Sequence, residues 1–292
     1  MNGVLIIDKP AGMTSHDVVY RVRKLTGERS VGHLGTLDPM ATGVLPLVLG
    51  KMTRLAQFYL KSDKRYEGVI RLGQATDTYD AEGEPVGEPQ PVNVTVDRLR
   101  ELAKRFTGKI QQTPPPFSAK KVAGVPAYKL ARKKKDVELA AVEVDVKELE
   151  IVSQTGKDVT FRSLVSGGTY LRCIAHDLGQ LLGVGAHLAG LRRTAVAEFT
   201  LEEARTLEQL EETARAGRVE ELLVHPRRIL PAMPAVTADP ESAARMRNGM
   251  AVNLPEMSKA GLVKVFAGQS ELLGIASRVA GTLFQPKIVL AG

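Results

Sequence analysis

The sequence predicts two domains, a large one that mixes helices with strands and a small C-terminal β-barrel. Up to about residue 230, segments with alternating β-branched residues are interspersed with segments whose apolar residues recur every three or four positions. The proline-containing stretch Pro231–Pro234 is typical of a linker. Beyond it, short apolar segments separated by Gly and Pro turns run from Ala251 to Leu290, as in a small barrel. We therefore expect domains at residues 1–233 and 234–292.

The first elements follow from short local patterns. Val4–Ile7 is a continuous apolar run and predicts a buried strand that ends in the turn Asp8–Gly12. Thr14 or Ser15 then caps a helix, because both hydroxyls suit an N-cap, and Gly27 ends it. The expected buried face of this helix consists of Val18, Val22 and Leu25.

Three later segments predict strands because β-branched residues alternate with polar ones in them. They are Tyr66–Leu72, Ala141–Val152 and Val159–Val165. A turn at Ser166–Thr169 leads into a helix that Gly183 ends. The apolar stripe of that helix consists of Leu171, Ile174, Leu178 and Leu181.

Two more helical segments are expected towards the C-terminus. The first is an acidic stretch around Leu201–Leu223. The second is Glu241–Asn248, which Asp239 caps and Gly249 ends.

Composition limits the class of protein. The 292 residues carry a formal net charge of +7 and a pI of about 9.4, which favours an anionic partner such as nucleic acid. No apolar run approaches the roughly 20 residues of a transmembrane helix, and Met1–Lys9 lacks the pattern of a signal peptide. Cys173 is the single cysteine, so an intramolecular disulfide is excluded and a cytoplasmic location is expected. One cysteine and five histidines offer little for a zinc site, and we expect no metal.

Three short motifs do not carry the chemistry that their letters suggest. Gly50–Thr53 resembles the end of a phosphate-binding loop, but Leu45 stands where that motif needs its first glycine. Ser15–Asp17 spells a catalytic triad, yet adjacent residues on a helix do not face one another. Cys173 and His176 share a helix face without further ligands nearby, which favours a buried thiol over a metal site.

The strongest local signal is the glycine-rich segment Gly32–Gly43, since glycines allow a backbone to approach a ligand closely. Asp38 in this segment precedes Pro39, and a residue before proline favours extended conformations. Asp38 is therefore expected in a loop or at the end of a strand. From spacing alone, its carboxylate is a nucleophile, a base, or a residue that makes local turn hydrogen bonds.

The segment Gly32–Gly43 resembles the active-site motif of the TruB-type tRNA pseudouridine synthases, which has the form G-H-x-G-T-L-D-P-x-A-T-G-x-L-P. Other blocks of that family's pattern occur in the same order along the chain. They are Gly3–Pro10 with Gly12, Thr14 and Ser15, then Lys64–Tyr66 with Leu72–Asp80, and then Ser166–Arg172 with Asp177–Gly179, Ala186–Leu188 and Leu191–Thr194.

The resemblance implies an α+β fold with a mixed or antiparallel central sheet flanked by helices, the pseudouridine synthase fold. A small C-terminal β-barrel that resembles an RNA-binding PUA domain follows it. An RNA-gripping insertion is implied at about residues 110–140. Ala197 departs from the family pattern, because many relatives have glycine at this position.

The implied activity is the isomerisation of uridine to pseudouridine at position 55 in the T loop of tRNA, without a cofactor. This reaction breaks the N1–C1′ bond, turns the base and rejoins it through C5, so a nucleophile or charge stabiliser is needed beside the sugar. By resemblance, Asp38 is the nucleophile. Attack at C1′ and attack at the uracil ring both stay open. The uridine must leave its stack to reach Asp38.

Two further residues belong to the expected catalytic set. Burial raises the pKa of an unpaired carboxyl group, and Arg172 is the family's candidate for the cation that offsets this effect. Tyr66 is expected to stack on the everted uracil, with a role in proton transfer left open. Without the resemblance, Tyr66 would equally be an ordinary aromatic residue of a sheet.

RNA contacts are expected at several places. By resemblance, His33 helps to hold the everted nucleotide, and Lys9 belongs to the same RNA-binding set, although with Pro10 it is expected to shape the pocket floor. A basic stretch occupies the place of the insertion, where we expect phosphate contacts, with a solvated charged surface as the alternative. The basic residues expected to bind RNA here and near the third block are Lys120, Lys121, Lys129, Arg132, Arg192 and Arg193.

Two other functions compete with this hypothesis. An RNA-folding protein would also evert bases, but the set of Asp38, Tyr66 and Arg172 favours an enzyme, because a pure binder has no need of a desolvated carboxylate facing a polyanion. A guide-RNA-dependent synthase is the second alternative. The chain's own insertion and its lack of long basic tails favour stand-alone action on the T stem-loop of tRNA. We expect a monomer without a guide RNA or a membrane partner.

Overall fold

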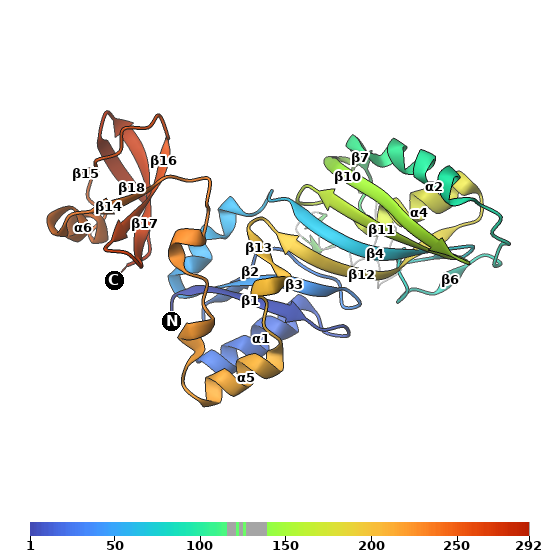
Figure 1. Ribbon diagram of the computed structural model, residues 1–292, viewed down its shortest axis with the longest axis horizontal. Coiled ribbons are helices and arrows are strands. Elements are labelled where there is room, and N and C mark those ends of the chain that lie inside the picture. The colour runs from blue at the N-terminus through green and yellow to red at the C-terminus, as the bar shows by residue number, and fades with distance from the viewer. Residues whose placement is uncertain (116–120, 123–124, 127–138, 292) are drawn as a thin grey trace.

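The computed structural model describes residues 1–115, 121–122, 125–126 and 139–291 (Figure 1). Its larger part is built on a nine-stranded sheet in the order β1-β3-β12-β4-β11-β10-β7, with β2 paired to β3 and β13 paired to β12. The strands are β1 Gly3–Lys9, β2 Val31–His33, β3 Thr42–Leu49, β4 Lys64–Leu72, β7 Gly108–Gln112, β10 Val142–Thr155, β11 Asp158–Val165, β12 Ala186–Val196 and β13 Phe199–Thr200. The pairs are antiparallel except β3 with β12, which is parallel. The expected α+β class with a mixed sheet is confirmed.

Helices cover this sheet. They are α1 Ser15–Thr26, α2 Val96–Ala103, α4 Leu171–Leu182 and α5 Leu207–Arg215, with 3-10 helices η1 Gly50–Phe58, η2 Lys104–Phe106, η3 Leu201–Glu203, η4 Val219–Leu222 and η5 Pro226–Arg228. Figure 1 shows α1 and α5 side by side next to the N-terminal strands, and an ion pair of 3.1 Å between Arg21 and Glu211 joins them. Among the described residues, no helix is long and apolar enough to span a membrane.

The local predictions held for the elements with clear patterns. Thr14 is the N-cap of α1, and its side chain accepts a hydrogen bond from the Asp17 N–H, while Gly27 ends the helix in the left-handed conformation. The expected strands correspond to β4, β10 and β11. Strands β3 and β12 and helix α2 were not expected, and the acidic stretch around Leu201–Leu223 is split into η3, α5 and η4 rather than being one helix.

Strand β1 supplies side chains to two separate hydrophobic cores. Leu5 and Ile7 pack into a core that also contains residues of α1 and α4. Val4 and Ile6, on the opposite face, pack into a second core. Burial on both faces explains why β1 is a continuous apolar run instead of an alternating one. The second core includes residues of the C-terminal sheet, namely Phe266, Leu272, Ile275, Ile288 and Leu290.

The C-terminal part contains a five-stranded sheet in the order β14-β16-β17-β18-β15, with α6 Pro240–Arg247 packed against it (Figure 1). Its strands are β14 Ala235–Ala238, β15 Val252–Asn253, β16 Leu262–Ala267, β17 Glu271–Ala280 and β18 Leu283–Val289. The Arg54 guanidinium of η1 donates to the Val289 carbonyl at 3.0 Å, so this sheet contacts the larger part directly. Two short antiparallel strand pairs complete the described part of the chain: β5 Ala75–Thr76 with β6 Pro85–Val86, and β8 Lys121–Val122 with β9 Val125–Pro126.

Candidate active site

Asp38 lies in the loop between β2 and β3, and neighbouring elements fix this loop at several points. The Ser15 hydroxyl accepts from the Leu37 N–H at 2.8 Å and donates to the Leu37 carbonyl at 3.1 Å. The Ala41 N–H donates to the Asp38 carbonyl at 3.1 Å, which closes a turn. Ser15 is thus an anchor for the residue before Asp38. The Asp38 side chain is held on a rigid support, as a reacting group requires.

Arg193 of β12 also fixes the Asp38 loop through hydrogen bonds. Its guanidinium donates to the carbonyls of Gly35 at 2.9 Å, Thr36 at 3.1 Å and Val44 at 2.8 Å. The side chain is fully buried. The expectation that Arg193 contacts RNA phosphates is therefore wrong, because the side chain is fully buried and its three nitrogens each donate to a carbonyl inside the protein. Its role is to tie β12 to the loop that carries Asp38.

The close contact between β12 and β3 requires glycine at position 43. Its φ is +102°, and a β-carbon there would lie 2.2 Å from the Arg193 carbonyl oxygen. Any side chain would push β12 away from β3, where Arg193 and Gly43 are paired in register. The glycine in the motif is explained by this close approach.

Lys9 at the end of β1 is also fully buried. Its ammonium donates to the carbonyls of Pro10 at 2.8 Å, Met13 at 2.6 Å and Pro39 at 3.1 Å. Burial lowers the pKa of Lys9 to about 8. Its assignment to the RNA-binding set is wrong, since its three donors are taken up by carbonyls. The contact with Pro39 joins the N-terminal turn to the Asp38 loop.

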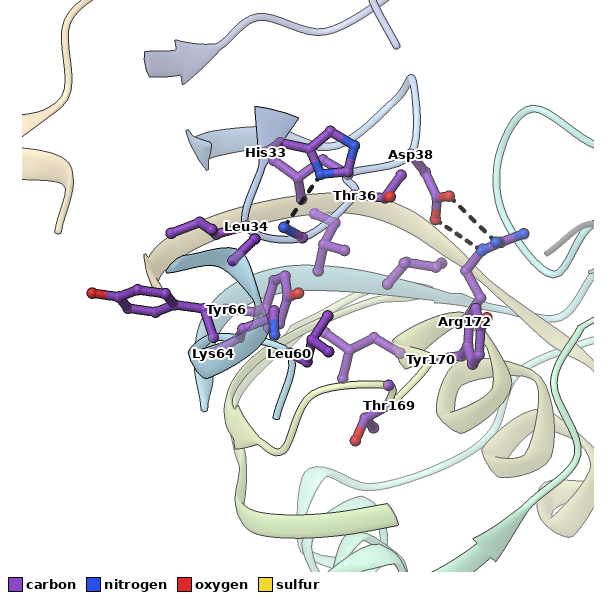
Figure 2. A pocket seen from close by; sticks show the side chains of 18 residues that line it. His33, Leu34, Thr36, Asp38, Leu60, Lys64, Tyr66, Thr169, Tyr170 and Arg172 are labelled. Atoms are coloured by element: carbon purple, nitrogen blue, oxygen red, sulfur yellow. Dashed lines mark hydrogen bonds and ion pairs between the residues drawn. The ribbon is translucent and has the colours of Figure 1, made fainter. Parts of the chain in front are cut away.

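Arg172, in the first turn of α4, pairs with two carboxylates (Figure 2). Its Nε lies 3.0 Å from Asp38 Oδ2, and its Nη2 donates to Asp38 Oδ1 at 3.3 Å. Its Nη1 lies 3.5 Å from Asp80 Oδ2 and donates to the Thr78 carbonyl at 3.1 Å. A cation in the first turn of a helix opposes the helix dipole, and the two carboxylates offset that effect. The structure therefore brings Asp38 and Arg172 together.

The acidity of Asp38 reflects this environment. Burial raises the pKa of its carboxyl group above the usual 3.8, and the Asp80 charge raises it further. The Arg172 guanidinium and the Lys9 ammonium act in the opposite direction. Asp38 is consequently more basic than a free aspartate while a bidentate cation directs its oxygens.

Two residues that sequence reasoning missed hold Arg172 in place. Asp80 accepts from the Thr78 hydroxyl at 2.6 Å and from the Glu82 N–H at 3.1 Å, so its carboxylate is fixed before it meets Arg172. Gln112 of β7 donates to the Tyr170 carbonyl at 3.0 Å and accepts from the Tyr170 N–H at 2.7 Å, just before α4 begins. Asp80 belongs to the block Leu72–Asp80, which was a usable signal. Gln112 lies in no motif.

Tyr79 directly follows Thr78, whose carbonyl accepts a hydrogen bond from Arg172. Its φ of 67° is unusual for a residue with a side chain. Its ring stacks on His176 of α4, with centroids 3.8 Å apart and planes 15° apart.

The Cys173 thiol of the same helix contacts the Thr113 carbonyl at 3.3 Å. Among the described residues, no group of three or more His, Cys, Asp or Glu side chains could hold a metal ion.

A cavity of about 390 Å³ opens beside Asp38, and Figure 2 shows its two ends. Asp38 and Arg172 lie at one end, while Lys64, Tyr66 and Leu34 lie at the other. Tyr66 is a buried aromatic residue of β4 that also lines the cavity, and its stacking on a uracil stays a prediction. The cavity places an aromatic ring and a carboxylate around a space that admits a small polar group.

His33 lines the same cavity as a neutral imidazole. Its Nδ1 accepts a hydrogen bond from the Gly35 N–H at 3.3 Å, which leaves the ring proton on Nε2. Burial lowers the pKa of His33, and the Arg193 charge lowers it further. A neutral side chain suits contact with a nucleotide more than acid catalysis.

The remaining residues of the expected RNA-binding set lie apart from the cavity or outside the described residues. Arg192 is half-exposed and forms an ion pair with Asp8 at 2.7 Å. The side chain of Lys121, and all of Lys120, Lys129 and Arg132, lie outside the described residues.

Comparisons with known proteins agree with this geometry. Three family models match consecutive segments: the TruB family pseudouridylate synthase N-terminal domain at residues 23–171, the tRNA pseudouridylate synthase B C-terminal domain at 172–236, and the Pseudouridine synthase II TruB C-terminal model at 234–290. The tRNA pseudouridine synthase B of Solibacter usitatus is 48% identical and covers 99% of this chain and 100% of its own length. That of an Azoarcus species is 40% identical over 100% of this chain and 95% of its own.

Among solved structures, an H/ACA ribonucleoprotein bound to a substrate RNA containing 2′-deoxyuridine is similar, with a TM-score of 0.74. The two chains are 26% identical, and the match covers 99% of this chain and 85% of that one. The order of the blocks, the loop that presents Asp38 and these matches lead to one conclusion. The chain belongs to the TruB family of pseudouridylate synthases.

Proposed function

We propose that this chain converts uridine 55 in the T loop of tRNA to pseudouridine, with Asp38 as the nucleophile. The observation that carries the proposal is the ion pair of Asp38 with the buried Arg172 at one end of a cavity that Tyr66 also lines. Relatives named tRNA pseudouridine synthase B match the chain over nearly its whole length, which supports tRNA as the substrate.

The geometry suits a base that has left its stack. The everted uridine enters with its ribose towards Asp38 and its base against the Tyr66 ring, since aromatic stacking is the usual grip on a splayed-out base. Asp38 attacks or stabilises the sugar–base junction, while Arg172 keeps its carboxylate ionised and directed.

The reaction balances within the substrate. The N1–C1′ bond breaks and its electron pair stays with the uracil, which then turns. The C5–C1′ bond forms, C5 gives up its proton and N1 takes one. Because the product is an isomer of the substrate, no external oxidant or group donor is consumed.

We further assign residues 1–233 to a catalytic domain and residues 234–292 to a PUA-like RNA-binding domain. The five-stranded sheet that begins at Ala235 supports this division. Stand-alone action without a guide RNA is supported by the relatives that match along the chain, whereas the H/ACA structure is similar at 26% identity. His33 is the residue of the described cavity that we assign to nucleotide binding besides Tyr66.

The test is tritium release from a T stem-loop RNA that carries 5-tritiated uridine at position 55. Wild type should release tritium without added metal or nucleotide, and Asp38→Asn should release none while it still binds the RNA. Asp97→Asn, which removes an exposed carboxylate paired with Arg100, is the matched control and should behave as wild type. RNA binding by wild type without release would refute the enzyme assignment for this RNA. Release from an RNA labelled elsewhere would refute the position.

A further inference from the structure

Lys64, the first residue of β4, is a buried cation that the proposed chemistry has not yet used. It is 8% exposed and lines the cavity at the end away from Asp38 (Figure 2). In β4, buried and exposed residues alternate, so Lys64 and Tyr66 point to the same face of the sheet. Residues two apart in a strand are separated by about 7 Å, which places the Lys64 side chain beside the ring on which we place the uracil.

The ammonium of Lys64 has few hydrogen-bond acceptors inside the protein. Its Nζ donates to the Ser62 carbonyl at 3.0 Å. Within the described part of the chain, Lys64 takes part in no ion pair, and the neighbouring Asp63 pairs with Lys147 at 2.6 Å instead. An ammonium has three N–H donors, and Lys64 uses one of them on an acceptor among the described residues.

A second cation lies close by and makes the position less favourable. A β-carbon at Gly35 would lie 3.1 Å from Lys64 Cε and 3.5 Å from Arg193 Nη1, so both side chains lie under the same residue. Burial lowers the pKa of Lys64 to about 8, and the Arg193 charge adds to this effect while Asp63 opposes it.

Other buried cations of this protein have more acceptors than Lys64 has. Arg193 and Lys9 each donate to three carbonyls, and Lys264 donates to the carbonyls of Arg227 and Ile229. Lys64 differs in having one acceptor and in facing the cavity. A buried charge of this kind costs folding free energy unless another partner completes it.

We propose that the everted uridine supplies that partner: Lys64 donates a hydrogen bond to a carbonyl oxygen of the uracil and stabilises the negative charge that gathers on the base. This inference rests on the proposed function. When the N1–C1′ bond breaks, its electron pair moves onto the uracil and is shared with the carbonyl oxygens. A fixed donor in a site with little water stabilises such charge strongly, because it needs no reorganisation as the charge develops.

The uracil fits this position better than a phosphate does. A phosphate carries its full charge before and after the reaction, so it would be bound through the backbone of the RNA at the cavity mouth. Lys64 is instead on the same strand face as Tyr66 and is equally buried, each residue being 8% exposed. The charge that it meets is one that exists only while the bond is broken.

The experiment measures single-turnover rates and RNA affinity for Lys64→Met, which keeps the length of the side chain and removes the ammonium. Lys61→Met is the matched control, because Lys61 is exposed and does not line this cavity. We expect Lys64→Met to lose about 100-fold in rate at saturating enzyme, with the Kd for the stem-loop changed less than about threefold. Lys61→Met should keep the wild-type rate.

A second substrate tests the charge directly. Fluorine at C5 withdraws electrons and stabilises the uracil anion, so the deficit of Lys64→Met should shrink by about tenfold with 5-fluorouridine at the target position, followed as loss of the N-linked nucleoside. For Lys64→Ala, added ethylammonium should restore part of the rate in proportion to its concentration. This rescue separates a missing donor from a misfolded site.

Three outcomes would overturn the inference. A weakened Kd with an unchanged saturated rate, and a salt dependence reduced by about one phosphate contact, would make Lys64 a phosphate ligand. An equal deficit with uridine and 5-fluorouridine and no rescue by ethylammonium would make its role structural. Absence of turnover in wild type and Lys61→Met alike would reject the proposed function itself, and this result differs from a loss confined to the Lys64 variants.

Discussion

The two ends of the active-site cavity differ in how their buried cations are paired. At the Asp38 end, the Arg172 guanidinium lies between two carboxylates and a carbonyl, and one of the carboxylates, that of Asp80, is itself held by further hydrogen bonds. At the Lys64 end, an ammonium and the Arg193 guanidinium lie under one glycine, and Lys64 has one acceptor. At the first end the protein itself supplies the partners of the cation. At the second end, under our proposal, the bound uridine supplies the missing partner.

This difference separates two tasks. A nucleophile has to be in the correct ionisation state and direction before the substrate arrives, so its partners belong to the protein. A stabiliser of transient charge works best when that charge is absent in the resting enzyme, because binding then favours the transition state over the ground state. Substitutions at the two ends should therefore have different effects on the reaction rate, its pH dependence and the stability of the protein.

The largest effect is expected for Asp38→Asn. Loss of the nucleophile should lower the single-turnover rate by roughly 10⁴-fold or more. RNA affinity should stay within about threefold, since Arg172 keeps Asp80 and the Thr78 carbonyl as partners. The measurement is product formation after rapid mixing, beside filter binding. A residual rate within tenfold of wild type would show that another group does the chemistry.

Arg172→Gln comes next, with an expected loss of about 10²–10³-fold. The guanidinium lowers the pKa of Asp38 against the effect of burial, so its removal should raise that pKa. Because ionised Asp38 is the active form, activity is lost as the pH falls through this pKa. The acidic limb of the pH–rate profile should therefore move to higher pH. An unmoved limb would mean that Arg172 does not act through the carboxylate.

Asp80→Asn should have a smaller effect on the rate, about 10- to 100-fold, because Arg172 loses one of its two carboxylates but keeps the other. The sign of the pH effect is the sharper result. The Asp80 charge raises the pKa of Asp38, so its removal should lower that pKa and move the acidic limb to lower pH. A shift in the same direction as for Arg172→Gln would contradict the arrangement at this end.

The two buried lysines should respond oppositely to replacement by methionine, although burial lowers the pKa of both to about 8. Lys64→Met removes a poorly satisfied charge and should raise the Tm, by roughly 2–4 °C for each kcal/mol regained. Lys9→Met leaves three partly buried carbonyls without their donor and should lower the Tm.

The pH dependence of this stability difference follows from linkage. Lys64 has a pKa of about 8 in the folded state against an ordinary value of 10.5, so below pH 8 it is charged in both states and its burial cost is complete. Above pH 8 the folded protein releases that proton first, and wild type gains stability relative to Lys64→Met. Calorimetry at pH 7 and pH 9.5 should show the advantage of the variant shrinking. A constant difference would mean that charge is not its cause.

The smallest effect is expected at Ala197, whose N–H donates to the Asp63 carbonyl at 3.0 Å, next to Lys64. Ala197 has a φ of 50°, where glycine is preferred. Ala197→Gly should increase the free energy of unfolding by about 1 kcal/mol without changing the rate. Ala216→Gly, at a φ of −81°, is the control and should not stabilise the protein. Equal effects in denaturant titrations would show that backbone strain at Ala197 is negligible.

The sequence indicates the elements that local chemistry determines. Thr14 with Asp17 forms the reciprocal cap of α1, and Gly27 and Gly183 end α1 and α4. Strand β3 escaped prediction because Pro46 interrupts its apolar run and because it follows directly on a turn-rich loop. Strand β12 carries Gly190 and two arginines, so its alternation is weak. Tertiary burial, not local propensity, places these two strands inside the sheet, between β1 and β4.

Contacts between residues far apart in the sequence also limited the prediction of the active site. The motif containing Asp38 and the resemblance identified the carboxylate and its partner Arg172, since both lie in ordered blocks. The motif did not show that Arg193 and Lys9 face inwards, because a basic residue in an RNA-binding family is expected to be exposed. Their burial depends on the carbonyls of a loop whose path cannot be read from one sequence.

The second core also bears on how this protein is made. Val4 and Ile6 lie near the N-terminus, yet their core includes Phe266 and Ile288. Other members of this core, such as Val44 and Phe199, precede the C-terminal sheet, so a chain that emerges from the ribosome covers Val4 and Ile6 in part before β18 follows and completes the core.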